Sequence, residues 1–444
     1  MSDKSPAARA GNAPAHAGNH EVESGVLKKV LTASFIGNFV EWFDYASYGY
    51  FATVIAHAFF PEIDKSAALM ATFAVFAISF IVRPIGGIVW GAIGDRIGRR
   101  TALSYSILIM SGATTVISFL PSYQQVGLLA PALLLLVRMV QGFSASGEYA
   151  GATSFIAEYS PVNRRGLYTS MVPASTAAGL LVGSLMSAAL FALLDGAQMQ
   201  SYGWRLPFLL AAPLGLIGLY IRLKLEDTPK FRELEESHHV PQTPVRELFG
   251  SFRKEIVISF GVTCLNAVGF YLILSYMPTY LITEMGMDES QSFLANSVSL
   301  AFYIGLIFLM GGLSDRFGRK TALIVASLLF MALTVPLFSM LDGASLAGII
   351  AIQVAFGALL TVNDGTLPGF LSEIFPTKVR YSGFAFSFNS ANALFGGTAP
   401  FVATWLIGAT GSKVAPAWYL VGAAAVALVA MIASRETAGR PLAD

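Results

Sequence analysis

Six ionisable residues lie inside long apolar runs of the sequence, where a charge needs a physical reason. They are four acids and two arginines: Glu41, Asp44, Arg83, Arg138, Glu148 and Asp364. A charged side chain at the centre of a lipid bilayer costs about 2.5 to 3.5 kcal/mol on insertion scales. Such residues either form buried ion pairs or exchange protons and ligands, and their role depends on the elements that carry them.

These elements are expected to be membrane helices. The chain has 444 residues, of which 55% are hydrophobic and 12% charged, and its mean hydropathy is +0.63. Apolar runs of about 20 residues, the length that crosses a hydrocarbon core, recur between short polar segments. This composition excludes a soluble globule with a charged surface. We therefore predict an all-α membrane protein with about twelve transmembrane helices in two six-helix bundles.

The apolar runs give six predicted helices in each half of the chain. In the first half they span residues 30–58, 67–93, 101–120, 127–157, 167–194 and 206–221. In the second half they span residues 256–282, 291–313, 320–340, 346–372, 382–408 and 415–433. The expected domains are a disordered tail (1–27), a bundle (28–221), a charged linker (222–254), a second bundle (255–434) and a tail (435–444).

The basic residues predict the orientation of these helices. Most of the 28 Lys and Arg residues fall in the tails and the even-numbered loops. Short loops rich in Lys and Arg face the cytoplasm. Both termini are therefore predicted to be cytoplasmic.

Two patterns occur twice in the chain. Residues 91–100 read GAIGDRIGRR and residues 311–320 read GGLSDRFGRK, which places Asp95 and Asp315 220 positions apart. A second set keeps its internal spacing at an offset of 215: Glu158, Pro161 and Arg165 against Glu373, Pro376 and Arg380. The two halves are therefore parallel repeats.

The paired loops resemble the signature of the major facilitator superfamily, where they join the second helix to the third and the eighth to the ninth. Residues 37–44 (GNFVEWFD), 83–87 (RPIGG), 141–149 (QGFSASGEY), 203–208 (GWRLPF) and 225–229 (LEDTP) resemble the metabolite:proton symporters of that superfamily. These are bacterial inner-membrane proteins that take up proline, betaine, citrate, 2-oxoglutarate and related solutes. The resemblance implies proton-coupled import by alternating access.

Three segments bear on the branch of this family. Residues 276–281 (YMPTYL) and 435–442 (RETAGRPL) resemble the proline and betaine transporters. Residues 395–400 (FGGTAP) are as similar to the citrate carriers. A proline or betaine type of osmoprotectant is the first expectation for the substrate, and a di- or tricarboxylate such as citrate or 2-oxoglutarate is the alternative.

Charges present in both halves are expected to serve the architecture that the halves share. We predict that they form charge relays at helix ends and act as a gate. The alternative is that they only fix the topology of the loops. The predicted gating residues are Asp95, Arg96, Arg99, Glu158, Arg165, Asp315, Arg316, Arg319, Glu373 and Arg380.

Charges found in one half only are expected to serve proton coupling. Glu41 and Asp44 are three residues apart and share one helical face. Two carboxylates held close in a low-dielectric site cannot both ionise freely, so one of them is suited to take up and release a proton. We predict that Glu41 or Asp44 carries the proton, with Arg83 and Arg138 as counter-ions. Structural ion pairing is the alternative.

Two further observations bear on proton coupling. Residues 138–142 (RMVQG) resemble the fourth-helix motif linked to proton coupling in the superfamily, and Glu148 is a weaker candidate for the proton site. At the 220-residue offset, Glu41 and Arg83 correspond to Gly261 and Tyr303, so the first half is electrically specialised.

Substrate recognition is expected from polar and aromatic groups that face a shared cavity. An arginine suits a carboxylate, and aromatic rings suit a substituted ammonium through cation–π contact. The predicted substrate residues are Asn38, Trp42, Tyr45, Asn266, Tyr271, Tyr276 and Asp364. Packing alone would also explain the aromatic ones.

Other classes find little support in the sequence. A net charge of +1 argues against a nucleic-acid partner. The sequence has no phosphate-binding lysine loop and no intramembrane cluster of metal ligands, so we expect no cofactor, no metal and no enzymatic activity. We expect a monomer in the lipid bilayer. A channel or a membrane sensor remains the alternative of another class.

Overall fold

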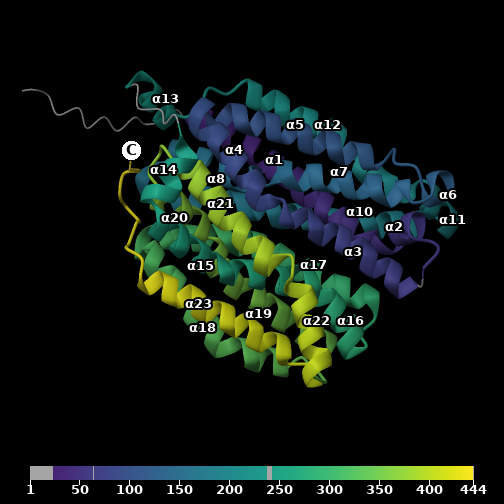
Figure 1. Cartoon of the computed structure of the whole chain (residues 1–444). Helices are drawn as coiled ribbons and strands as arrows, with labels where there is room; N and C mark the ends of the chain where they lie inside the picture. The colour runs from purple at the N-terminus through teal and green to yellow at the C-terminus, as the bar shows by residue number, and fades with distance from the viewer. Residues whose placement is uncertain (1–23, 64, 238–242, 444) are drawn as a thin grey trace, which may run out of the picture.

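The computed structural model describes residues 24–63, 65–237 and 243–443, and every regular element in these ranges is helical. The long helices form two groups that lie side by side (Figure 1). Helices of the first half, drawn purple to teal, make one group, and helices of the second half, drawn green to yellow, make the other. The predicted all-α architecture is confirmed. Most of the expected tail, residues 1–23, lies outside the described residues, and residues 24–27 already belong to the first helix.

The elements of the first half are α1 (Ser24–Tyr50), α2 (Ala52–Phe59), α3 (Lys65–Ile81), α4 (Arg83–Ile97), α5 (Arg99–Ile117), α6 (Tyr123–Val126), α7 (Leu129–Ala145), α8 (Glu148–Tyr159), η1 (Val162–Arg164), α9 (Arg165–Thr169), α10 (Met171–Leu193), α11 (Gly196–Ser201), η2 (Gly203–Arg205) and α12 (Leu206–Leu223). The expected linker holds two short helices, α13 (Pro229–Glu236) and α14 (Pro244–Ser251).

The elements of the second half are α15 (Arg253–Gly269), η3 (Phe270–Tyr276), α16 (Met277–Met285), α17 (Glu289–Phe317), α18 (Arg319–Ser339), α19 (Leu346–Asp364), α20 (Leu367–Ile374), α21 (Arg380–Ala391), η4 (Asn392–Gly396), α22 (Ala399–Thr410) and α23 (Ala415–Ile432). The segments η3 and η4 are π-helical. Short π segments inside α-helices are frequent at functional sites.

Two helix breaks place two of the buried acids. In the first half α7 ends at Ala145, and Glu148 opens α8. In the second half Asp364 closes α19, and α20 follows with Pro368 in its first turn, where the missing backbone N–H costs nothing. The breaks therefore lie at corresponding places in the two halves, and each one holds an acid.

Ten helices in the described part of the chain are long and apolar enough to cross a membrane. Two further long helices, α1 and α5, are not among the ten. The helix α1 has 27 residues and α5 has 19, which correspond to about 40 Å and about 28 Å at the α-helical rise. Because α1 carries two lysines and two acids, and α5 begins with two arginines, their mean hydropathy is lower. Together these helices account for about twelve spans.

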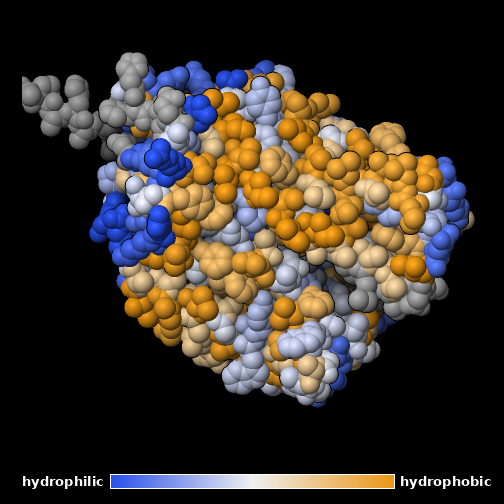
Figure 2. Space-filling model, in the orientation of Figure 1, coloured by the Kyte–Doolittle hydropathy of each residue, from blue (hydrophilic) through white to orange (hydrophobic). Residues whose placement is uncertain are grey.

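The two bundles touch through a few helix pairs, chiefly α4 with α21 and α10 with α17. Small residues allow the close approach: a Cβ on Gly91 of α4 would lie 2.4 Å from the Cα of Ser382 on α21. Figure 2 shows an apolar zone across the middle of the visible face, with hydrophilic residues gathered at its two ends. The surface is hollowed between the bundles, near the end that carries α16 and α22 (Figures 1 and 2).

Candidate functional site

Glu41 and Arg83 form a buried ion pair in the first bundle. Glu41 lies on α1 and is 2% exposed, and Arg83 opens α4 and is 3% exposed. The Nη2 atom of Arg83 also donates to the Tyr45 hydroxyl at 2.8 Å. Neither the Oε2 atom of Glu41 nor the Nε atom of Arg83 has a hydrogen-bond partner among the described residues. The pair therefore keeps free hydrogen-bonding capacity, which a ligand can use.

A second buried pair lies one helical turn along α1. Arg138 of α7 donates from Nη1 to the Oδ2 atom of Asp44 at 2.9 Å. Arg138 also bonds Gln141, and Gln141 in turn bonds Thr114 of α5. The guanidinium lies 4.1 Å from the centre of the Tyr48 ring. The sequence prediction that Arg83 and Arg138 lie beside Glu41 and Asp44 agrees with this geometry.

Glu148 pairs with an arginine that the sequence analysis placed in the linker. Arg222 is the next-to-last residue of α12, is 2% exposed, and forms an ion pair with Glu148. Its Nη1 atom also donates to the Leu103 carbonyl at 2.7 Å. The expected linker start at residue 222 is therefore too early, because α12 continues to Leu223. A charge at the end of an apolar run gives no sign of which way its side chain points.

Asp364 is bound differently from the three acids of the first half. It is 1% exposed and accepts hydrogen bonds from Asn266 at 2.7 Å and from the Tyr303 hydroxyl at 2.6 Å. Among the described residues no arginine, lysine or histidine forms an ion pair with it. Asp364 is thus held by neutral donors, and Tyr303 is a partner that the sequence analysis did not select.

Aromatic residues of both halves meet beside the Glu41–Arg83 pair. The aromatic cluster comprises Trp42, Tyr45, Phe80, Phe270 and Tyr271. Trp42 packs edge-on against Phe270 with ring centres 4.9 Å apart, and Phe80 packs edge-on against Tyr271 at 5.7 Å. The Nε1 atom of Trp42 and the hydroxyl of Tyr271 are buried without a hydrogen-bond partner in the described part of the chain. The cluster therefore joins the bundles and holds unused donors.

Two of the predicted substrate residues have other contacts. The amide nitrogen of Asn38 donates to the Val172 carbonyl and to the hydroxyls of Ser175 and Thr176, at 2.7–2.9 Å, which fastens α1 to α10. The hydroxyl of Tyr276 bonds Thr404 at 2.8 Å. These residues lie at helix contacts, whereas Trp42, Tyr45 and Tyr271 lie in the aromatic cluster.

The repeated charges gather at one end of the molecule, here called the charged end and defined by Asp95, Arg99, Glu158, Arg165, Asp315, Arg319, Glu373 and Arg380. Glu158 of the first half contacts Arg99 at 3.2 Å and Arg380 of the second half at 2.6 Å. In the same way Glu373 contacts Arg319 at 3.2 Å and Arg165 of the first half at 2.9 Å. Each glutamate therefore ties the two bundles together.

The two aspartates of the charged end cap helices across the interface. Asp95 accepts from the backbone N–H groups of Tyr381 and Ser382 at 3.2 and 2.9 Å, at the start of α21. Asp315 accepts from Gly166 and Leu167 at 2.8 and 2.9 Å, at the start of α9. A carboxylate at a helix N-terminus satisfies free N–H groups and favours the helix dipole. The bundles are thus closed against each other at this end.

Two further acids cap helices within their own halves, and the sequence analysis missed them. Asp227, just after α12, accepts from the N–H groups of Arg99 and Arg100 at 3.0 and 3.3 Å. Glu436, just after α23, accepts from Arg319 and Lys320 at 2.8 and 3.1 Å.

The residue after each of these acids is a threonine whose hydroxyl donates to the glutamate of the charged end. Thr228 bonds Glu158, and Thr437 bonds Glu373 at 2.6 Å. The shared signal was an acid followed by threonine behind the last helix of each half.

Arg96 and Arg316 do not join the charged end. Both are exposed, and among the residues that the structure describes neither one forms an ion pair. Each follows its aspartate by one position, which turns its side chain by about 100° around the helix, away from the neighbouring bundle. No contact supports the predicted gating role for these two arginines.

The chain belongs to the Major Facilitator Superfamily, whose model matches residues 34–388 and 259–441. The structure superposes on the proton:xylose symporter XylE bound to 6-bromo-6-deoxy-D-glucose with a TM-score of 0.80, over 94% of this chain and 98% of that one. The sequence identity to XylE is 18%, so this likeness concerns the fold. The predicted family and fold are confirmed.

Among named relatives, the chain is similar to bacterial transporters. It is 38% identical over 437 residues to the glycine betaine/proline/ectoine/pipecolic acid transporter OusA of Dickeya dadantii (strain 3937), covering 95% of this chain and 86% of that protein. It is 36% identical over 433 residues to the proline/betaine transporter of Escherichia coli (strain K12), covering 95% of this chain and 86% of that protein. A putative proline/betaine transporter of Staphylococcus haemolyticus (strain JCSC1435) is 39% identical over 433 residues, covering 95% of this chain and 90% of that protein. The protein is a membrane transporter.

Proposed function

We propose that this chain is a proton symporter that imports a small zwitterion of the proline and betaine type. The names of its relatives support this substrate class, because glycine betaine, proline, ectoine and pipecolic acid each combine a carboxylate with a cationic nitrogen. One site with an arginine and several aromatic rings suits all four. The observation that supports this proposal most is the buried Glu41–Arg83 pair beside the aromatic cluster, where the two bundles meet.

The proton enters this proposal as an exchange of partners. Protonation of Glu41 removes the negative charge that holds Arg83, and the guanidinium can then bind the carboxylate of the substrate. The cationic nitrogen of the substrate lies against Trp42 and Tyr271, where cation–π contact contributes about 0.5 to 2 kcal/mol. Loss of the proton restores the Glu41–Arg83 pair and expels the substrate. The proton and the solute therefore move together.

Asp44 and Arg138 have the same geometry and can exchange partners in the same way. Their pair is held by Gln141, and Arg138 stacks on the first-half rings of Tyr48 and Phe76, whereas Arg83 stacks on Phe80, which packs against Tyr271 of the second bundle. Glu41 is therefore the first choice for the proton site and Asp44 the second. Among the described residues Glu148 bonds Arg222 and none of the second bundle, so it serves the first bundle's own packing.

Alternating access follows from the charged end. Its ion pairs and helix caps hold the bundles together, and they break when the bundles rock to open this end. The sequence's excess of Lys and Arg in the tails and even-numbered loops supports a cytoplasmic charged end, with both termini in the cytoplasm and the protein in the bacterial inner membrane. We treat the protein as a monomer.

The test is uptake into proteoliposomes that hold the purified full chain. Radiolabelled glycine betaine, proline, citrate and 2-oxoglutarate are compared with and without an imposed pH gradient, acidic on the side of solute entry. The proposal expects accumulation of betaine or proline that disappears when a protonophore collapses the gradient. Accumulation of citrate alone would replace the substrate class, and equal accumulation after the protonophore would end the claim of proton coupling.

A further inference from the structure

An open cavity of about 640 Å³ lies on the surface near the charged end of the molecule. It is formed between α4 and the linker helix α14, and its lining residues are Ala92, Arg96, Thr243, Pro244, Val245, Arg246, Phe249, Gly250 and Arg253. The helix α14 contacts both α4 of the first bundle and α21 of the second. The cavity thus opens where the linker crosses the junction of the two bundles.

The charges of this cavity are all of one sign. Arg96, Arg246 and Arg253 line it, and no acid among the described residues does. The three side chains are exposed, and in the described ranges none of them forms an ion pair. The acid of the same helix, Glu247, is instead engaged with Lys378. Three guanidinium groups around one cavity without a counter-charge match an anion.

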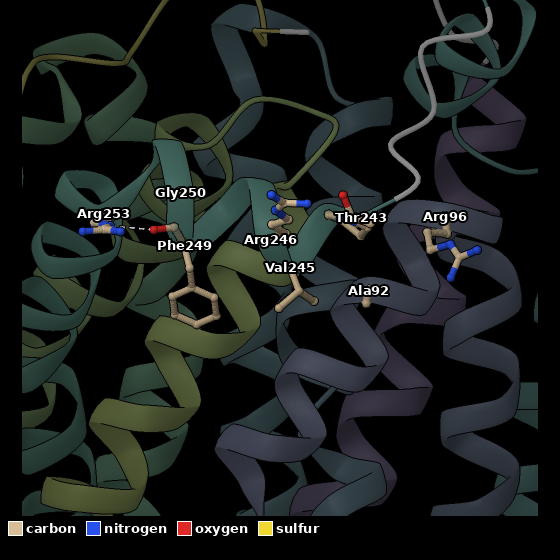
Figure 3. Close-up of a pocket in the computed structure, with 9 residues that line it drawn as sticks. Ala92, Arg96, Thr243, Val245, Arg246, Phe249, Gly250 and Arg253 are labelled. Carbon is tan, nitrogen blue, oxygen red and sulfur yellow. Dashed lines mark hydrogen bonds between the residues drawn. The ribbon is translucent and has the colours of Figure 1, made fainter.

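The cavity is polar at one level and apolar at the next. In Figure 3 the three arginine head groups lie at about the same height, and the side chains of Ala92, Val245 and Phe249 lie below them, toward the helices of the bundle. Phe249 packs edge-on against Phe386 of α21 with ring centres 5.0 Å apart. An inorganic anion would use the arginines but leave this apolar floor uncovered, whereas an amphiphile matches both levels.

An exposed apolar strip continues from the floor of the cavity along α4. Ile85 is 60% exposed and Val89 is 38% exposed. Together with Ala92 and Arg96 these residues recur at intervals of three or four, which places them on one face of the helix. The strip spans about 16 Å at the helical rise, a length comparable to that of an extended acyl chain, and it lies in a predicted membrane span.

We infer that this cavity binds an anionic phospholipid, with the phosphate at Arg246, flanked by Arg96 on one side and Arg253 on the other, and an acyl chain along the Ile85–Val89 face of α4. Each basic residue near an anionic lipid surface strengthens binding roughly fivefold. The inference does not depend on which solute is transported.

The test measures lipid binding to the purified full chain in detergent by native mass spectrometry. Dioleoyl phosphatidylglycerol is titrated, and dioleoyl phosphatidylcholine, dihexanoyl phosphatidylglycerol and inorganic phosphate are compared with it. Only dioleoyl phosphatidylglycerol should bind tightly. Dioleoyl phosphatidylcholine lacks net charge, dihexanoyl phosphatidylglycerol lacks long acyl chains, and inorganic phosphate has no acyl chain. Inorganic phosphate that displaces the lipid at similar concentration would show a soluble-anion site and overturn the inference.

Variants locate the site. Arg246→Gln with Arg253→Gln should weaken binding of dioleoyl phosphatidylglycerol about thirtyfold. The matched control, Arg164→Gln with Arg435→Gln, removes two exposed arginines from the same end and should leave the affinity unchanged. Equal affinity of the two double variants would contradict the proposal.

A photoactivatable phosphatidylglycerol gives a second measurement on the unmodified chain. Cross-links should map to α4 and α14, and cross-links confined to other helices would contradict the site even if the double variant fails to fold.

Discussion

The two halves of the molecule are matched at the charged end and unmatched at the centre of the membrane. At the charged end each half contributes an aspartate that caps a helix of the other half and a glutamate that bridges two arginines. At the centre the first half holds Glu41 and Asp44, each beside an arginine, whereas Glu148 pairs with Arg222 at the end of α12. The second half holds Asp364, which is bonded to the neutral side chains of Asn266 and Tyr303.

This difference separates two tasks. Closing one end of two bundles is a task that both halves share, so a duplicated sequence can supply both sets of contacts. Coupling a proton to a solute requires a charge that changes its partner, and one copy of that arrangement is enough. At the charged end, substitutions of corresponding residues in the two halves should therefore have equal effects. At the centre, substitutions in the two halves should have different effects.

The largest expected effect is at the proton site of the first half. Glu41→Gln should abolish gradient-driven accumulation of solute in proteoliposomes, because the glutamine cannot exchange a proton while Arg83 loses its charged partner. Membrane insertion should not change, and accumulation is normalised to the amount of folded protein, because breaking a buried ion pair also lowers stability. Asp364→Asn keeps the size of the side chain and should retain accumulation, because neutral donors surround it.

The reverse outcome would move the proton site. Accumulation that survives in Glu41→Gln and is lost in Asp364→Asn would place proton exchange in the second half. Asp44→Asn should resemble Glu41→Gln, and full accumulation in both variants would refute the assignment to α1.

A smaller but still large effect is expected from either glutamate of the charged end. Removing one partner of a buried ion pair costs about 3 to 5 kcal/mol. Glu158→Gln should therefore favour opening of this end, and Glu373→Gln should do so to the same extent. The measurement is maleimide labelling of a cysteine introduced as Ala385→Cys, on the face of α21 that packs against α4, in a Cys264→Ser background. The labelling rate should rise by about 150- to 5,000-fold.

The control for this pair is an exposed ion pair near the same end. Glu226 lies 2.7 Å from Arg232, with exposed fractions of 77% and 48%. Because exposed pairs contribute about 1 kcal/mol or less, Glu226→Gln should leave the labelling rate near that of the parent. A clear difference between Glu158→Gln and Glu373→Gln would break the proposed equivalence of the two halves.

A moderate effect on substrate affinity is expected from the aromatic cluster, to which the two halves contribute different residues. Trp42→Leu should raise the KM for glycine betaine about 2- to 30-fold, which corresponds to the loss of one cation–π contact. Tyr271→Leu should have a similar effect from the second half. Trp405→Leu is the control, because Trp405 is 60% exposed on the outside of the second bundle. An unchanged KM in both cluster variants would remove the aromatic residues from substrate binding.

Much of this architecture could be predicted from the sequence. The apolar runs predicted the helices, and eight of the ten residues predicted from the two repeats meet at the charged end, because a pattern that recurs at fixed spacing specifies contacts that both halves need. Arg96 and Arg316 belong to the repeated pattern yet face solvent. The helical periodicity of α4 and α17 would have shown that they point away from Asp95 and Asp315.

The remaining errors concern packing between helices distant in the sequence. Arg222 lies at the end of an apolar run, and only the approach of α8 to α12 makes it the partner of Glu148. Asn38 has the chemistry of a substrate residue, but α10 passes close enough to take all its donor capacity. The cavity beside α14 also requires three separate elements to meet. No local pattern carries this information.

The smallest expected effect concerns the caps that follow the last helix of each half. Asp227 caps α5 and Glu436 caps α18, in both cases behind a glycine with positive φ, Gly98 and Gly318. Losing such a cap costs about 1 kcal/mol, so Asp227→Ala and Glu436→Ala should each raise the labelling rate of the introduced cysteine about fivefold.

The two caps also test whether the halves close as one unit. If both act on the same closing transition, their effects should multiply in the double variant, because the sites share no side-chain contact. Asp195→Ala is the control, since Asp195 caps α11 through Gln198 at 2.8 Å, at the opposite end of the molecule, and should not change the rate. Single variants that label at the parent rate would show that each cap stabilises only its own bundle, and the equivalence of the halves would then concern the ion pairs alone.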